Sequence, residues 1–508
     1  MSDTKNKIRV RFAPSPTGPL HMGGVRTALY NYLFAKQLGG DFILRIEDTD
    51  TARFVPGAED YIVQSLKWCG IEPTEGVGFN DGPHAPYRQS ERQAQGIYRP
   101  FVDKLIADGL AYYAFDTKDD LEAMRTRLKE AGMKTTSYDV RTRETMNNSL
   151  KMSADEIKAK LESGTPYVVR IKMPINKEIK FDDLIKGPMK ILSHQVDDKV
   201  LYKSDGPTYH LANVVDDHLM EITHVIRGDD WLPSCPLHII LYDYFGWDRP
   251  QFAHLPLVVG PSGKKLSKRD GDTLGFPVYP LRWKDPTTGE TSSGYKERGY
   301  LPEAFVNMLA LIGWNPGGNV EIMSMDEMIS LFSLDRVNKS SAKFDLKKAE
   351  FLNRTYMKKA NDERLATIWS DILHRDRPSG VEKLTLGDNR MIGIAVKSLK
   401  EKNMYIDQFW NNGKYFFIDP PGYSADARYF SFNKAMMNKL QNDQTITHDE
   451  AKAIFEAVIV SENLDARDAG KFLRLAITGM EVGPPMFDIM SAIGPDACHR
   501  RLGNTQFS

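Results

Sequence analysis

The first fifty residues show two hydrophobic periods in turn. Apolar and polar positions alternate over residues 8–12, which is the period of a β-strand. From residue 25 to 38 the apolar positions recur at helical spacing, and Gly39-Gly40 is typical of a helix C-terminus. The apolar run 42–46 predicts a second strand. A strand, a helix and a parallel strand begin a doubly wound sheet, so we predict an α/β fold built on a doubly wound parallel sheet.

The pattern changes between about residues 111 and 200. A charged helix is predicted at 119–131, and polar segments and a β-rich stretch at 167–171 follow it. The doubly wound pattern then resumes, with strands predicted at 200–202, 225–226 and 255–259 and a helix at 236–245 closed by Gly246. From about residue 301 the periodicity is helical, with apolar positions such as Val458, Phe472 and Leu502 on the predicted core faces.

The composition is that of an ordinary multidomain globular protein. Of the 508 residues, 41% are hydrophobic and 27% are charged, and the net charge is −1. Nucleic-acid binders often carry a basic excess, so this balance argues weakly against that class without excluding local basic patches. Three unpaired cysteines, an N-terminus without an apolar core and no apolar run of about 18 residues lead us to expect a cytoplasmic protein.

The first candidate for chemistry lies at the predicted strand-to-helix junction. The run Arg11-Phe-Ala-Pro-Ser-Pro-Thr-Gly-Pro-Leu-His-Met-Gly-Gly24 places His21 and Gly23-Gly24 there. In doubly wound folds ligands bind beyond the C-terminal ends of strands, near helix N-termini. A histidine can donate a hydrogen bond to a phosphate oxygen, and glycines allow close approach. The alternative is a surface histidine in a glycine turn.

The second candidate is the lysine loop, Lys264-Lys-Leu-Ser-Lys-Arg269, which follows the predicted strand at 255–259. Lys265 and Lys268 can place positive charge against the phosphates of a nucleotide. Phosphoryl and nucleotidyl transfer depend mainly on positioning and charge stabilisation, and they need no side-chain nucleophile. The alternative is a solvated basic loop, which the upstream histidine motif makes the weaker interpretation.

Both motifs resemble those of class I aminoacyl-tRNA synthetases, the first the HIGH region and the second the KMSKS loop. The wording Arg-Phe-Ala-Pro-Ser-Pro-Thr-Gly, followed by Ile46-Glu-Asp-Thr-Asp50, resembles glutamyl-tRNA synthetases of the bacterial type. Further matches in the family's order lie at 86–92, 207–218 and 225–231. The resemblance is close from residue 7 to about 350 and thinner afterwards, although 476–502 also resembles the family's last helices.

The resemblance implies roles for individual residues. It implies that His21, Lys265 and Lys268 are catalytic. It implies a substrate site made of Arg11, Ala13, Ser15, Glu47, Tyr209, Asn213 and Arg227, and an ATP site made of His21, Gly23, Gly24, Asp230, Val258 and Lys268. Glu47 can pair with the substrate ammonium group, and Arg11 and Arg227 can clamp a carboxylate. For Arg227 the alternative is a salt bridge to Asp229 or Asp230.

The resemblance also implies a division of the chain. We expect the nucleotide-binding domain at 1–110 and 201–260, an inserted α/β acceptor-stem domain at 111–200, the lysine loop with a stem-contact domain at 261–350, and an all-helical anticodon-binding part at 351–508. The segment 275–299 is longer than the family leads us to expect. It reads as a solvent loop or as a loop ordered by tRNA.

Two departures from the family pattern affect the expected metals and activity. Gly24 replaces the final histidine of the HIGH pattern, which the glutamyl branch tolerates. Many bacterial members carry a cysteine cluster for zinc in the inserted domain, but here no cysteine lies between residues 70 and 234. A structural zinc needs about four Cys or His ligands, so we predict none. Mg²⁺ is expected to accompany ATP, held mainly by phosphates and water.

The expected function is that of a glutamate–tRNA ligase acting on L-glutamate, ATP and tRNA(Glu), as a monomer without membrane attachment. Glutaminyl-tRNA synthetase is the nearest rival, but its opening motif differs and its anticodon region is a β-barrel. A truncated relative that modifies a tRNA base, a small-molecule adenylyltransferase and a non-catalytic tRNA-binding module are further alternatives, each of which leaves the helical C-terminal half or the intact motifs unexplained. The sequence leaves open whether tRNA(Gln) is also charged.

Overall fold

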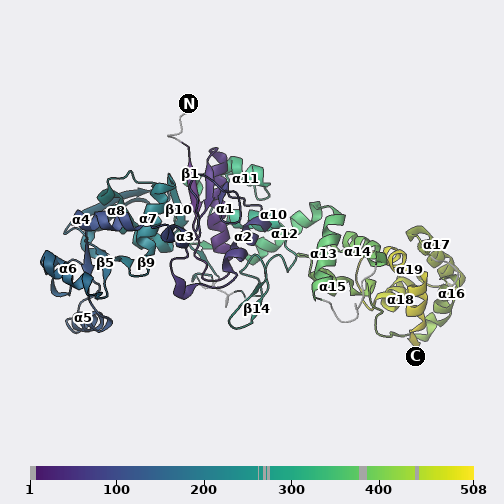
Figure 1. Ribbon diagram of the computed structural model, residues 1–508. Helices are drawn as coiled ribbons and strands as arrows, with labels where there is room; N and C mark the ends of the chain where they lie inside the picture. Colours follow the sequence, from purple (N-terminus) through teal and green to yellow (C-terminus); the bar gives the residue numbers. More distant parts are fainter. Residues whose placement is uncertain (1–6, 261–262, 267–270, 272–274, 377–385, 441–444) are drawn as a thin grey trace. The chain divides into compact units, whose positions relative to one another are not determined.

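The computed structural model describes residues 7–260, 263–266, 271, 275–376, 386–440 and 445–508. The chain divides into two compact units, which are treated separately below. The first comprises Met1–Ser292 and Val306–Phe344, and the second comprises Ser293–Phe305 and Asp345–Ser508. Figure 1 labels their helices and strands.

The first unit begins with the predicted strand, helix and parallel strand. These are β1 (Arg9–Phe12), α1 (Met22–Gln37) and β2 (Asp41–Leu44). β2 pairs in parallel with β1 on one side and with β3 (Glu75–Gly76) on the other. The helices that follow are α2 (Ala58–Trp68), α3 (Gln89–Ala94) and α4 (Arg99–Ala107). Val10, Phe42 and Leu29 are fully buried, so the apolar pattern that predicted these elements is the pattern of the core.

A second sheet continues beside β1 (Figure 1). Its strand order is β10 (His224–Gly228), β11 (Gln251–Leu255), β6 (Glu178–Asp183) and β7 (Gly187–Leu192), and only β6 and β7 are antiparallel. The backbone N–H of Thr223 donates to the carbonyl of Arg9 at 2.9 Å, which joins the start of β10 to β1. The accompanying helices are α7 (Tyr209–Leu219) and α8 (Cys235–Phe245), the latter closed by Gly246 at φ 68° as predicted.

The prediction that the parallel pattern resumes at 200–202 is wrong. These residues form β8 (Val200–Lys203), which pairs antiparallel with β5 (Val168–Ile171) in a sheet completed by β4 (Ala111–Ala114) and β9 (Gly206–Pro207). α5 (Lys118–Glu130) and α6 (Ala154–Glu162) accompany this sheet. Its small core consists of Tyr112, Ala114, Met124, Tyr138 and Met146. The hydrophobic pattern of a strand does not indicate which strand it pairs with, so a short strand between two sheets is easily assigned to the wrong one.

The strand predicted at 255–259 is divided in two. β11 ends at Leu255, Pro256 follows, and β12 (Val258–Val259) pairs instead with β15 (Ala342–Lys343). Proline lacks the N–H that a continuing strand would need.

The segment after the lysine loop is only partly exposed. It contains the hairpin β13 (Trp283–Lys284) and β14 (Thr291–Ser292). Trp283 is buried, with its ring centroid 5.3 Å from that of Tyr61 in α2. Near the start of the segment, the carbonyl of Val278 accepts from the backbone N–H of Met22 at 2.9 Å. The solvent-loop interpretation therefore fails for the base of this segment, which packs on the first unit. α10 (Pro302–Leu311) and α11 (Met325–Leu331) follow.

The second unit is helical, as the periodicity predicts. Its helices are α12 (Leu346–Lys359), α13 (Asp362–Asp376), α14 (Leu386–Leu399), α15 (Gln408–Gly413), α16 (Phe430–Leu440), α17 (His448–Ser461), α18 (Ala466–Thr478) and α19 (Met486–Gly503). The short strands β16 (Ser424–Ala425) and β17 (Gln506–Phe507) pair in parallel. Val458, Phe472 and Leu502 belong to one buried cluster, together with Trp369 and Phe432. Within the described ranges, no helix has the length and apolar character needed to cross a membrane.

Candidate active site

A cavity of about 520 Å³ collects the predicted site residues. Its lining includes Arg11, Ala13, Ser15, His21, Gly23, Gly24, Glu47, Tyr209, Asn213, Arg227, Asp230, Val258 and Lys265. Most of these residues come from the C-terminal ends of β1 and β10 and the segments that follow them, from the turn after β2, and from α1 and α7, while Val258 and Lys265 come from β12 and the lysine loop. Lys268, the remaining predicted residue, lies outside the described residues. The cavity thus lies where doubly wound folds bind their ligands.

His21 is the N-cap of α1. Its Nδ1 accepts the backbone N–H of Gly23 at 3.0 Å, so in the neutral ring the proton is on Nε2. The surrounding protein atoms and the charge of Lys265 lower the pKa of His21, which favours that neutral form. The ring can therefore donate from Nε2 while its other nitrogen holds the start of the helix. Helix N-termini of this kind favour phosphate groups.

The two glycines after His21 make room for their neighbours. A Cβ atom at Gly23 would lie 2.8 Å from Cε1 of His21, and one at Gly24 would lie 2.4 Å from Cδ1 of Leu20. Both distances are below any van der Waals contact. A side chain at Gly23 would thus displace the ring that caps α1, which explains the glycine two positions after the histidine.

The described part of the lysine loop turns back on itself beside His21. The backbone N–H of Leu266 donates to the carbonyl oxygen of Val258 at 3.0 Å, and the backbone N–H of Gly260 donates to the carbonyl oxygen of Lys264 at 2.9 Å. Lys265 Nζ lies 2.9 Å from Asp230 Oδ2, and about half of each side chain is exposed. Exposed ion pairs contribute little stability. Lys265 can therefore exchange Asp230 for a phosphate at low cost.

Glu47 presents one carboxylate oxygen to the cavity. Its Oε1 accepts from Asn213 Nδ2 at 2.9 Å and from Arg45 Nη2 at 3.0 Å. Within the described part of the chain, no hydrogen bond engages Oε2. Burial raises the pKa of Glu47, and Arg45 opposes that shift. A cationic ligand group at Oε2 would favour the ionised carboxylate in the same direction as Arg45.

Arg11 is already paired. Its Nε and Nη2 donate to the two oxygens of Asp217 at 3.0 and 3.2 Å, and Arg45 Nη1 reaches the same carboxylate at 2.7 Å. All three side chains are buried. Nη1 of Arg11 makes no hydrogen bond to any other described residue. The sequence places Arg11 at a substrate carboxylate, but in the structure most of its charge is balanced by Asp217.

Arg227 has no carboxylate partner among the described residues. Its nitrogens donate to Tyr209 Oη at 3.1 Å, His254 Nε2 at 3.1 Å and His238 Nδ1 at 3.3 Å. The alternative of a salt bridge to Asp229 or Asp230 is wrong, because these pair instead with Lys186 and Lys265. Burial raises the pKa of Tyr209 to about 12, so this partner is neutral. Arg227 is therefore a buried cation that lines the cavity without a direct carboxylate contact from any residue the structure describes.

Sequence reasoning missed Arg45 and Asp217, which hold Glu47 and Arg11 in place. The signal was a charged residue in an apolar run, since Arg45 interrupts Phe-Ile-Leu-Arg-Ile and Asp216-Asp217 follow Val-Val in α7. Asp216 is also fully buried and accepts from Arg92 Nε at 2.7 Å. Buried charges persist only when they are paired or bind a ligand, so such positions deserve consideration as site residues.

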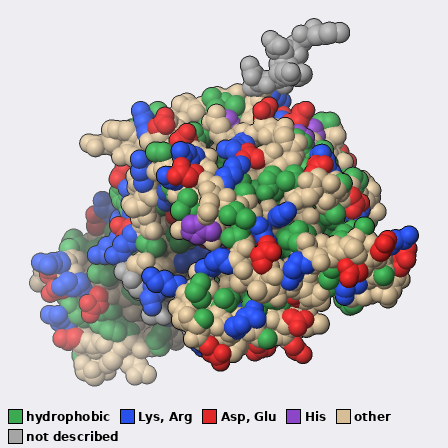
Figure 2. All heavy atoms as spheres, turned by 90° about the vertical axis from the view of Figure 1, so that its left-hand side faces the viewer, with side chains coloured by type: hydrophobic (Ala, Val, Ile, Leu, Met, Phe, Trp, Pro, Cys, Tyr) green, Lys and Arg blue, Asp and Glu red, His purple; other side chains and the backbone are tan. Residues whose placement is uncertain are grey.

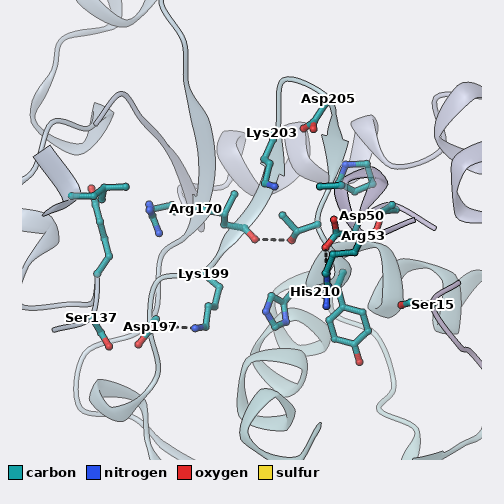
Figure 3. Close-up of a pocket in the computed structure, with 18 of the residues that line it drawn as sticks. Ser15, Asp50, Arg53, Ser137, Arg170, Asp197, Lys199, Lys203, Asp205 and His210 are labelled. Carbon is teal, nitrogen blue, oxygen red and sulfur yellow. Dashed lines mark hydrogen bonds and ion pairs between the residues drawn. The ribbon is translucent and has the colours of Figure 1, made fainter. Parts of the chain in front are cut away.

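A second cavity of about 570 Å³ adjoins the first and shares Ser15, Glu47, Arg53, Tyr209 and Trp231 with it. Its other wall comes from the part of the unit around β5 and β8. Figure 3 shows Arg170 and Lys199 on that wall, with Arg53 and Ser15 across the cavity.

Charges of both signs line this second cavity. Arg125, Arg170, Lys199 and Lys203 lie there together with Asp50, Asp197 and Asp205. Lys199 pairs with Asp197 at 2.8 Å, whereas Arg125, Arg170 and Lys203 form no ion pair with any described residue. Basic and acidic side chains are likewise interspersed over the face of the protein shown in Figure 2. The cavity thus offers a few cations for a phosphate, although the net charge of the chain is close to zero.

The described residues contain no cluster of side chains suited to bind a metal ion. No set of three or more His, Cys, Asp or Glu side chains there is placed to hold a metal ion. The described side chains therefore offer no ready-made Mg²⁺ or zinc site of their own. The absence of a bound zinc stays a prediction.

Comparisons with known proteins agree with this geometry. Residues 7–351 match the family model for the catalytic domain of class I tRNA synthetases (E and Q), and residues 347–506 match an anticodon binding domain. A glutamate–tRNA ligase of Cytophaga hutchinsonii is 47% identical over 99% of this chain and 98% of its own length. One of Christiangramia forsetii is 48% identical over 98% of both chains.

Solved structures give the same result for the fold. The glutamate–tRNA synthetase of Elizabethkingia anophelis superposes with a TM-score of 0.87 at 43% identity, covering 98% of this chain and 99% of its own. A glutamate tRNA ligase from Elizabethkingia meningosepticum, solved in complex with its amino acid, matches equally well at 42% identity. The predicted class I synthetase fold with a helical C-terminal anticodon domain is confirmed. The chain belongs to the class I tRNA synthetases and, within them, to the glutamate–tRNA ligases.

Proposed function

We propose that the 520 Å³ cavity activates L-glutamate with ATP and that the adjoining cavity delivers the product to tRNA(Glu). The observation that carries this proposal is the pair Glu47 and Arg227. Among the described residues, Glu47 Oε2 accepts no hydrogen bond and Arg227 forms no ion pair, and both line the same cavity as His21 and Lys265. An amino acid with an ammonium group and a side-chain carboxylate complements both.

Activation needs no protein nucleophile. An α-carboxylate oxygen of glutamate attacks the α-phosphorus of ATP, the bond from that phosphorus to the bridging oxygen breaks, and diphosphate leaves. His21 Nε2–H and the ammonium group of Lys265 donate to phosphate oxygens on which negative charge develops. Lys268 is assigned the same role from the sequence. Mg²⁺, when bound to the ATP phosphates, would add further charge stabilisation.

The substrate is oriented by groups from both sheets. Glu47 Oε2 accepts from the ammonium group, and Arg227 donates to the side-chain carboxylate. Arg11 contributes only through Nη1, because Asp217 holds its other edge. Ser15 and Tyr209 line the cavity between these charges. The α-carboxylate is thereby left to face the phosphates near His21.

The second cavity is proposed to hold the 3′ end of the tRNA. Arg170, Lys199 and Lys203 can pair with backbone phosphates, and the cavity opens onto Glu47 and Tyr209. A hydroxyl of the terminal ribose attacks the carbonyl carbon of glutamyl adenylate and AMP leaves. The hydroxyl proton passes to the departing phosphate or to water. Residues 111–200 are accordingly assigned to the acceptor stem, 261–350 to the lysine loop and stem contacts, and 351–508 to the anticodon.

Aminoacylation assays test the proposal. The purified chain should form Glu-tRNA with purified tRNA(Glu), glutamate and ATP, and it should exchange diphosphate only with glutamate. A parallel assay with purified tRNA(Gln) decides whether that tRNA is also charged. Failure to charge tRNA(Glu), with the protein folded by circular dichroism, would overturn the proposal.

We also propose that the enzyme is a cytoplasmic monomer, since its substrates are cytoplasmic and its three cysteines are free and buried. Light scattering across a concentration series tests the oligomeric state. A mass that stays at 57.6 kDa agrees with the proposal, and twice that mass contradicts it.

A further inference from the structure

Three adjacent strands bring a carboxylate, an imidazole and a guanidinium into one line. Arg227 of β10 and His254 of β11 are register partners, so their side chains lie on the same face of the sheet. Asp183 ends β6, the strand on the other side of β11. His254 Nδ1 lies 2.6 Å from Asp183 Oδ2, and Arg227 Nε lies 3.1 Å from His254 Nε2.

The chemistry of these groups fixes the position of every proton. Arginine can only donate, so His254 Nε2 must accept and its proton must be on Nδ1, where it donates to Asp183. The backbone N–H groups of Ile185 and Lys186 hold the other oxygen of Asp183 at 3.0 and 2.8 Å. The carboxylate thus selects one tautomer of His254, and that tautomer presents a lone pair to Arg227.

A second imidazole, that of His238, also accepts a hydrogen bond from the Arg227 guanidinium. His238 Nδ1 accepts from Arg227 Nη1 at 3.3 Å, and its Nε2 is directed at His210 Nδ1, also at 3.3 Å. Burial lowers the pKa of His238 well below its usual value, and Arg227 adds to that shift. Burial likewise lowers the pKa of His254, against the opposing effect of its hydrogen bond to Asp183. Arg227 is therefore oriented by neutral acceptors, whereas Arg11 is oriented by the charged Asp217.

We propose that Asp183 and His254 are positioning residues for glutamate selection, because they orient Arg227 through a neutral ring and leave its charge for the substrate. This inference rests on the proposed function, in which Arg227 binds the side-chain carboxylate. A carboxylate in direct contact with Arg227 would balance the guanidinium before substrate arrived. The His254 imidazole between Asp183 and Arg227 orients the guanidinium without neutralising it. The positive charge then remains available for the side-chain carboxylate of glutamate, and the uncharged amide of glutamine cannot pair with it.

Asp183→Asn is the discriminating variant. The asparagine oxygen can keep the N–H groups of Ile185 and Lys186, but its amide then turns donors towards His254 Nδ1 and towards the backbone N–H of His254, which lies 3.1 Å from Asp183 Oδ2. The ring must move its proton to Nε2, where it opposes the N–H of Arg227. The KM for glutamate should rise about ten-fold to a hundred-fold, as expected for losing one hydrogen bond to a charged group. The KM for ATP should stay within about two-fold, and the preference for glutamate over glutamine should narrow.

His254→Gln provides the rescue. Its amide oxygen can accept from Arg227 and it has no tautomer to exchange, so Asp183→Asn should add less than about two-fold to the glutamate KM in a His254→Gln background. Independent structural damage would instead multiply the two effects. Asp243→Asn is the matched control, since Asp243 of α8 pairs with Lys177 and Arg249 and does not line the cavity.

The outcomes separate this inference from the proposed function. A silent Asp183→Asn beside an impaired Arg227→Gln would overturn the positioning role and leave the proposed function intact. Equal rises in the KM for glutamate and for ATP would also overturn it, because they indicate general structural damage. A wild-type enzyme unable to charge tRNA(Glu) would overturn the proposed function itself. If Asp183→Asn does not fold, His254→Leu against His254→Gln repeats the comparison, and equal glutamate KM values for the two would overturn the role.

Discussion

Asn213 donates its side-chain amide to Glu47 Oε1 at 2.9 Å, across 166 residues of sequence. Arg45 donates to the same oxygen at 3.0 Å. Two donors on one oxygen fix the plane of the carboxylate, and the second oxygen is left to the cavity. A carboxylate held in this way loses little conformational entropy when an ammonium group binds.

Glu47→Gln should therefore impair glutamate use more than ATP use. The amide keeps the contacts of Asn213 and Arg45 through its oxygen, and so it turns an N–H group towards the substrate ammonium. We expect kcat/KM for glutamate to fall about ten-fold to a hundred-fold. Diphosphate exchange in the presence of tRNA measures the change. Glu59→Gln, which changes an ion pair with Arg88 outside the cavity, is the control, and equal losses in the two variants would argue against the role of Glu47.

His21 combines two roles that substitutions can separate. Asparagine can still cap α1 by accepting from Gly23, but it lacks a donor at the position of Nε2. His21→Asn should keep the thermal stability of the wild type and lose about 10²–10³-fold in adenylate formation, the usual loss for one transition-state donor. His21→Ala should also lose about 1 kcal/mol of stability with the cap. Calorimetry and diphosphate exchange check the two properties, and an active His21→Asn enzyme would contradict the phosphate contact.

Three lysines of the lysine loop can be compared by alanine substitution, with Lys264 as the control. Lys265→Ala and Lys268→Ala should each reduce adenylate formation, the latter by about 10²–10³-fold, with little change in glutamate affinity. Lys264→Ala removes a neighbouring exposed charge and should stay close to the wild type. Near-normal diphosphate exchange by Lys268→Ala in the presence of tRNA would remove that residue from the catalytic set.

Arg227→Gln should weaken discrimination between glutamate and glutamine. The two amino acids are nearly equal in size, but glutamine would turn amide donors towards guanidinium donors. Sites with such mispairing reject the analogue by roughly 10⁴ or more. In the variant, kcat/KM for glutamate should fall strongly, and the ratio of kcat/KM for glutamate to kcat/KM for glutamine should decrease. The measurement is kcat/KM for both amino acids with saturating tRNA, and unchanged values would mean that Arg227 does not contact the substrate.

The purified enzyme should contain no stoichiometric zinc. The segment where many bacterial members hold zinc is β4, Ala111-Tyr-Tyr-Ala114, and Tyr112 there donates to the buried Asp198 at 2.8 Å. Arg143 donates to the same carboxylate at 3.2 Å. Elemental analysis of chelator-treated protein decides the matter. One tightly held zinc per chain, with loss of activity on its removal, would show that the prediction is wrong.

Sequence alone predicted the parts of the fold and site that depend on local signals. The strand, helix and strand at 8–46 were correct because their apolar periods lie within single elements. The site residues converge because His21 and Glu47 follow the parallel strands β1 and β2, and Arg227 lies near the C-terminal end of the parallel strand β10. Strand ends at one edge of such a sheet meet whatever their separation in sequence.

Contacts between residues far apart in the chain could not be predicted from the sequence. Arg11 and Asp217 are 206 positions apart, and His254 and Asp183 are 71 apart. Nothing local indicates that the first pair is a buried ion pair or that the second orients an arginine. The wrong sheet for residues 200–202 has the same cause, because a strand's partner is chosen by tertiary packing and not by its own pattern.

The shared carboxylate of Asp217 has a consequence for how the chain tolerates change. It ties α7 to β1 through Arg11 and to the residue after β2 through Arg45, so the two halves of the amino-acid pocket are fastened directly to each other. Residues 111–171, from the start of β4 to the end of β5, take no part in these ion pairs. Insertions, deletions or wholesale exchange in this stretch can therefore alter how the acceptor end is received, while the activation chemistry keeps its geometry.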